Sequence, residues 1–203
     1  RHFRESGLLD SVQQSRQKAI DVLNKYTYLF HWEWSDKKTG PDLGFYNIFY
    51  WNHINCVDVV AMYCTIMRSA GLPVTESFTP KWRNSNGGHS WCTLPEPDGN
   101  LDLFTAVHQA PGGPSVLTPL RATKIYRKPF SPQPESPYFL RAKDEKLPPL
   151  YASPCIKDIT AQFLPSQDVK IQLNTRQKGK NLCWFSVFRT GQWMPVGWGT
   201  LNW

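Results

Sequence analysis

The stretch NCVDVVAMYCTIMRSAG, residues 55–71, decides the fold of this chain. Its apolar side chains recur at steps of three and four residues, which is typical of a buried helix. Asn55 suits the N-cap, Asp58 falls in the first turn, and Gly71 followed closely by a proline is a stop signal. The stretch therefore predicts a largely buried helix that begins at Cys56.

Cys56 is the candidate nucleophile. At the first position of a helix, unpaired backbone N–H groups and the positive end of the helix dipole favour a thiolate. The chain has five cysteines and no CxxC motif. Cys64 is eight residues further along the same helix, a rise of roughly 12 Å, which is too far for a disulfide with Cys56. An unpaired thiol in an exported protein is often there for chemistry, which favours Cys56.

A candidate base follows 33 residues after this cysteine, in the segment Asn86–Trp91. Its sequence, NGGHSW, predicts a turn that opens into a strand carrying His89. A thiol nucleophile needs a base, and histidine is the usual one. The alternating segment Leu101–Phe104 predicts a second strand that pairs with the first as a hairpin. Asp102 is then the nearest candidate to orient the imidazole.

The order of these elements resembles the transglutaminase-like superfamily. The resemblance is carried by Asn55–Cys56, Arg68–Val74 and Gly88–Trp91, and Phe78–Asn84 is similar to the branch found in exported bacterial proteins. It implies an α+β fold with a papain-like core, in which the cysteine lies on a helix N-terminus and the histidine and aspartate lie on antiparallel strands.

The resemblance also implies a Cys–His–Asp triad. Cys56 takes the place of the nucleophile and His89 that of the base. The family usually has its aspartate directly after an aromatic residue, whereas Thr105 follows Phe104 in this chain. Whether Asp102 or another group is the third member therefore stays open.

Several aromatic and polar residues are candidates for stabilising an oxyanion or walling the site. The family pairs the backbone N–H of the cysteine with a nearby donor, and Trp51, Asn55 and Trp82 could supply an indole or amide N–H. Trp91 shares a strand face with His89 and would cover the site. The alternative is that each tryptophan only forms a wall. His31 and His53 are interpreted as structural histidines.

The rest of the chain predicts a scaffold. Residues 6–28 form an amphipathic pattern that predicts one helix packed against the cysteine helix. We assign residues 1–155 to the core and residues 156–203 to a C-terminal β extension, with strands at Val169–Leu173, Cys183–Phe188 and Trp193–Trp198. Three strands alone are marginal. The extension therefore either packs on the core or continues into a further β domain beyond residue 203.

Composition and charge limit the classes of partner that the chain is expected to bind. The net charge is +7, and the stretch 121–157 holds eight Lys or Arg, three acids and seven prolines. This stretch has no nucleic-acid-binding pattern, so we interpret it as a solvated surface and expect no nucleic-acid partner. No run approaches the 18 apolar residues of a membrane helix. Since the chain starts at Arg1 without Met, we interpret it as a processed or cut chain. The resemblance to the exported branch implies a periplasmic, cell-surface or secreted protein.

Three functions follow. The first is thiol-dependent hydrolysis or acyl transfer at an amide of a peptide, a protein or the cell wall, with no cofactor. The second is a catalytically inactive module of the same fold that binds peptide or cell-wall glycan. The third, a zinc site built from Cys56, Cys64, His89 and Cys92, lacks metal-ligand spacing and is disfavoured.

Overall fold

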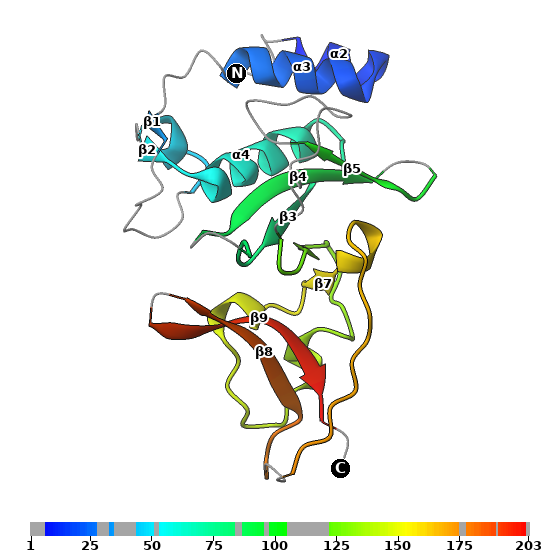
Figure 1. Ribbon diagram of the computed structural model, residues 1–203. Helices are drawn as coiled ribbons and strands as arrows, with labels where there is room; N and C mark the ends of the chain where they lie inside the picture. The colour runs from blue at the N-terminus through cyan, green and yellow to red at the C-terminus, as the bar shows by residue number, and fades with distance from the viewer. Residues whose placement is uncertain are drawn as a thin grey trace. The chain divides into compact units, whose positions relative to one another are not determined.

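The structure is a computed structural model that describes residues 7–27, 33–34, 44–50, 53–83, 87–95, 98–104, 122–174, 178–189 and 191–201. It combines helices with antiparallel β-sheets, so the predicted α+β class is confirmed. The chain forms two compact units, residues 1–77 with 89–119 and residues 78–88 with 120–203 (Figure 1). These boundaries differ from the division predicted at residue 155.

Helix α4, Cys56–Ser69, is the central helix of the first unit. The side-chain oxygen of Asn55 accepts hydrogen bonds from the N–H groups of Val57 and Asp58 at 2.9 and 3.1 Å. The Asp58 carboxylate in turn accepts from the Asn55 N–H at 3.2 Å, which completes a capping box. At the other end Gly71 takes a φ of 89° and its N–H donates to the Arg68 carbonyl. The predicted start and stop of this helix are confirmed.

The contribution of the Asn55 cap to stability can be tested by mutation. Replacing Asn55 with Ala removes the acceptor for two orphan N–H groups and should lower the free energy of unfolding by about 1 kcal/mol. Asn55→Asp keeps an acceptor and is the matched control, expected to unfold within a few tenths of a kcal/mol of the parent. Urea unfolding followed by circular dichroism measures both. Equal losses in the two variants would contradict a capping role for the side-chain oxygen.

Two helices, rather than the single predicted one, cover residues 8–27. Helix α2 is Leu8–Gln14 and helix α3 is Arg16–Thr27. Ser15 between them is extended, with a φ of −166°. Its hydroxyl accepts a hydrogen bond from the Lys18 N–H at 3.0 Å, so it acts as an N-cap for α3. The competition of a serine side chain for backbone N–H groups explains the break.

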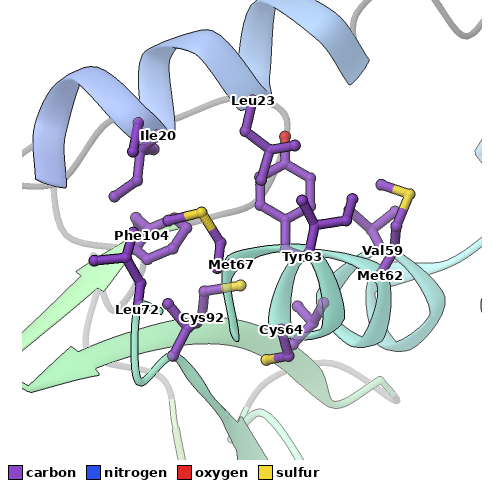
Figure 2. Packing of buried hydrophobic residues seen from close by; sticks show 14 of the residues in the cluster. Ile20, Leu23, Val59, Met62, Tyr63, Cys64, Met67, Leu72, Cys92 and Phe104 are labelled. Carbon is purple, nitrogen blue, oxygen red and sulfur yellow. The ribbon is translucent and has the colours of Figure 1, made fainter. Parts of the chain in front are cut away.

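The core of the first unit lies between α3, α4 and the strands below α4 (Figure 2). Tyr63 of α4 is fully buried, and its hydroxyl donates to the Asn24 side chain at 2.7 Å and lies 2.7 Å from the Thr27 hydroxyl. These bonds satisfy the one polar atom that the tyrosine brings into the core. The predicted packing of the N-terminal helical region against the cysteine helix is therefore confirmed.

The candidate base, His89, lies on the middle one of three neighbouring strands. Strand β4, His89–Pro95, lies between β3, Thr75–Thr79, and β5, Leu101–Phe104. Strand β3 continues into the second unit. Strands β4 and β5 are antiparallel, with Cys92 opposite Phe104 and Leu94 opposite Asp102. The predicted hairpin is confirmed, and the side chains of Cys92, Leu94 and Phe104 join the core.

The second unit holds two pairs of antiparallel strands. Strands β6, Tyr126–Arg127, and β7, Lys157–Asp158, form one pair, and β8, Leu182–Arg189, and β9, Gln192–Thr200, form the other. A cluster of aromatic rings packs with them, and the hydroxyl of Tyr126 donates to the Val196 carbonyl at 2.8 Å. The rings in contact there belong to Phe78, Tyr126, Tyr151, Trp184 and Trp198.

The C-terminal strands were predicted with mixed success. The two that form the β8–β9 hairpin are confirmed, with the turn at Gly191, whose φ is 81°. The strand predicted at Val169–Leu173 is wrong, because that segment is irregular and exposed. Its alternating pattern has no apolar surface to face, and alternation alone does not fix a strand that has no neighbour to pair with.

Short elements complete the described residues. They are β1 (Glu33–Trp34), η1 (Asn47–Phe49), β2 (His53–Ile54), α5 (Pro137–Leu140), η2 (Pro149–Tyr151) and η3 (Thr160–Gln162). Strands β1 and β2 pair in parallel. Within the described ranges, every helix is too short or too polar to span a membrane.

Candidate active site

The half-buried thiol of Cys56 lies where the N-terminus of α4 meets the start of β4. The backbone N–H of Ser90 hydrogen-bonds to its sulfur, and the N–H groups of Val57 and of Cys56 itself lie near it and also favour the thiolate. The Ser90 nitrogen is covalently joined to His89, so this bond brings the sulfur to the residue next to the candidate base. The fold thus places Cys56 and the backbone at His89 together, although they are 33 residues apart in the chain.

The protonation state of Cys56 is set by opposing effects. Burial raises the pKa of the thiol above its ordinary value and outweighs the three N–H groups, which lower it. The carboxylate of Glu76 raises the pKa further. The expected effect of the helix N-terminus is present, but the net shift is upward. Cys56 is therefore a neutral thiol at neutral pH and needs a base to become a nucleophile.

Glu76 is a site residue that the motifs did not reveal. It lies on β3, and the Ser90 hydroxyl donates to its Oε1 at 3.0 Å. The same Ser90 donates its backbone N–H to Cys56. Glu76 thus holds the residue that contacts the sulfur and adds negative charge close to it. The available signal was a lone carboxylate in the segment Val74–Phe78, whose other residues are apolar or carry hydroxyl groups.

Removing this charge should make Cys56 more reactive. In the folded protein the thiol pKa lies above that of the denatured chain, so alkylation should reach its half-maximal rate at higher pH than after denaturation. Glu76→Gln removes the smaller of the two contributions to that rise and should move the midpoint downward, so that labelling at pH 8 becomes faster. Iodoacetamide labelling read by mass spectrometry at Cys56 measures this. Glu135→Gln, an exposed change of equal charge, is the control.

His89 is the first residue of β4 and is half-buried. Its ring centroid lies 6.1 Å from that of Trp91, two residues on and on the same strand face. Burial lowers the pKa of the imidazole below its ordinary value. At neutral pH the ring is therefore uncharged, and an uncharged imidazole can accept a proton from a thiol.

The register does not bring Asp102 to His89. Asp102 lies opposite Leu94, five residues along β4 from His89. At about 3.3 Å per residue this is a separation of roughly 17 Å. Alternation also puts Asp102 on the strand face of Leu94, which packs with α4, and His89 on the opposite face, so His89 starts β4 on the side away from that helix. Any support for the imidazole must come from a group other than Asp102.

The remaining residues that the sequence suggested for the site lie in several different parts of the structure. The side-chain oxygen of Asn55 is used by the helix cap. Trp82 belongs to the second unit, where it bridges to Ala122. Trp91 is fully buried, and its indole N–H has no acceptor in the part of the chain that the structure describes. Trp51 and His31 lie outside the described residues, and His53 lies in β2.

The geometry does not assemble a metal site among the described residues. No group of three or more His, Cys, Asp or Glu side chains there is arranged to hold a metal ion. What the described part of the first unit does assemble is a thiol at a helix N-terminus, a carboxylate and a strand that begins with a histidine.

These features define an α+β protein with a candidate thiol site on a helix that packs against a sheet. Comparison of the chain with protein-family models, with curated proteins and with solved structures finds no match in any of the three. The functional assignment therefore depends on the site itself.

Proposed function

We propose that this protein is a thiol-dependent acyltransferase or hydrolase that acts on an amide bond. The observation that carries the proposal is the position of Cys56 at the first residue of α4, hydrogen-bonded by the backbone N–H of the residue that follows His89. We further propose that the fold belongs with the transglutaminase-like, papain-like group and that the protein is exported. The motifs at Asn55–Cys56 and Gly88–Trp91 support the first of these proposals, and the stretch Phe78–Asn84, which is similar to the exported branch, supports the second.

The chemistry follows from two neutral partners. For this chemistry the side chain of His89, the first residue of β4, must turn toward Cys56, where it takes the thiol proton while the sulfur attacks the amide carbonyl carbon. The backbone N–H of Cys56 is the proposed oxyanion donor, because those of Val57 and Asp58 already donate to the Asn55 side chain. The imidazolium then gives its proton to the leaving amine, and a thioester remains. Water completes hydrolysis, or a second amine completes acyl transfer, with His89 again accepting the proton.

A second candidate is a catalytically inactive binding module. The register of Asp102 favours it, because the expected third member of the triad is about 17 Å from His89. A Cys–His pair without an orienting group loses part of its rate enhancement rather than all of it. The position of the sulfur among three N–H groups therefore favours the catalytic proposal over this one.

A general acyl donor tests the proposal without a known substrate. The folded protein is incubated with p-nitrophenyl acetate and with hydroxylamine as the acceptor, and its intact mass is followed over time. The proposal expects an acetyl group on Cys56 that appears and then disappears, with many turnovers per molecule. Cys155, a half-buried thiol of the second unit, is the internal control. Slow, equal and stoichiometric acylation of Cys56 and Cys155 would instead favour the binding module.

A further inference from the structure

A pair of thiols, separate from Cys56, lies in the core of the first unit. Cys64 is on α4 and Cys92 is on β4, and their thiols hydrogen-bond to each other. Figure 2 shows the two side chains on facing elements, between the helix and the strand. Both cysteines are buried, Cys92 completely. The helix packs closely on this strand, and the hydrogen bond between the thiols brings the two sulfur atoms near each other in the folded state.

We propose that Cys64 and Cys92 form a disulfide that joins α4 to β4 when the chain folds under oxidising conditions. The oxidant is a small disulfide such as glutathione disulfide. One protein thiolate attacks a sulfur of the oxidant, forms a mixed disulfide and expels a thiolate. The second protein thiolate then attacks the mixed disulfide and expels the other thiolate. Two protein thiols lose two protons and two electrons, and one oxidant molecule becomes two thiols.

The fold favours this pair over the alternatives. Cys56 is two turns from Cys64 on the same helix, a rise of roughly 12 Å, which excludes a bond between them. Cys155 and Cys183 belong to the second unit. The Cys183 thiol lies on β8 and donates to the Gly199 carbonyl at 3.5 Å.

Burial determines when the bond can form. In the folded state burial and the neighbouring thiol raise the pKa of Cys92 well above its ordinary value, so little thiolate is present to react. An oxidant also has no access to a side chain that is fully covered. The bond must therefore form before the core closes, and a folded reduced protein should stay reduced. Once formed, it is protected from reductants by the same burial.

Refolding in a glutathione buffer tests the proposal. The Cys155→Ala/Cys183→Ala variant, which keeps Cys56, Cys64 and Cys92, is unfolded, reduced and refolded with glutathione disulfide. The full chain is treated in parallel. After alkylation in denaturant, we expect a mass loss of two hydrogens, one alkylated cysteine, and a single cross-linked peptide pair that contains Cys64 and Cys92. The oxidised protein should also unfold about 5–10 °C higher than the reduced protein.

Two outcomes would overturn the proposal. One is refolded protein in which Cys64 and Cys92 are both alkylated, whatever the state of Cys56. The other is a cross-link of Cys56 to Cys64 or to Cys92. The Cys92→Ser variant, refolded in the same way, should show no cross-link between residues 56 and 64. Both results are read from masses and do not depend on catalytic activity, so they are independent of the function proposed for Cys56.

Discussion

Replacing His89 with Gln is expected to slow acyl transfer by about 10²- to 10⁴-fold, the usual contribution of a positioned base. Glutamine keeps a polar side chain of similar size but cannot accept the thiol proton at neutral pH. Cys56 is a neutral thiol there because burial and Glu76 raise its pKa, so losing the base removes the route to the nucleophile. The measurement is the turnover of p-nitrophenyl acetate by the folded variant.

Asp102→Asn is the matched control for this prediction. It removes the carboxylate that the sequence offered as the third member of the triad, but that group lies about 17 Å from His89 in the register of β4 and β5. Its rate should stay within about threefold of the parent, the scale of a surface electrostatic change rather than of a lost catalytic partner. If Asp102→Asn lost as much activity as His89→Gln, the register or the role of His89 would be wrong.

The pH profile gives a second readout of the same base. Burial lowers the pKa of His89, so the imidazole stays uncharged to a lower pH than an exposed histidine would. The rate should fall as the pH falls through this lowered pKa, so the acid limb should lie below the ordinary value of about 6.5. In His89→Gln this limb should disappear. A variant that merely distorted the site would lower the rate and keep the limb.

The sequence predicted the elements that local chemistry determines. Asn55 and Asp58 define the start of α4 through a capping box, and Gly71 defines its end through a positive φ. The alternation in Leu101–Phe104 predicted a strand, and the short turn before it predicted its partner. Each of these signals acts over a few residues, which is why a pattern in the chain can reveal it.

The sequence could not predict features that depend on packing. The direction of the pKa shift at Cys56 comes from burial, which competes with the helix N-terminus and overcomes it. The failure of Asp102 to reach His89 comes from a strand register, in which the separation of two residues depends on the turn between them. Glu76 approaches the site only because β3 lies beside β4.

The two glycines before His89 also differ in a way that depends on packing and that the sequence does not reveal. The sequence identifies Gly87 and Gly88 as a turn, but neither has the positive φ that would require glycine. What distinguishes them is space. A Cβ on Gly88 would lie 2.6 Å from the Thr79 carbonyl oxygen and 2.8 Å from that of Pro80, whereas a Cβ on Gly87 would meet nothing within 4 Å.

Gly88→Ala should therefore be severe and Gly87→Ala mild. Because both close contacts are with backbone, the added methyl group must displace the chain that leads into β4, at a cost of about 1–3 kcal/mol in the free energy of unfolding. The displacement starts one residue before His89, so turnover should fall with stability. Gly87→Ala should change unfolding by less than about 1 kcal/mol, since it restricts the unfolded chain without a clash. Urea midpoints and turnover of both variants test this prediction. Equal effects of the two substitutions would show that Gly88 is not required for close packing. A stable but inactive Gly88→Ala would show that the packing serves to position His89.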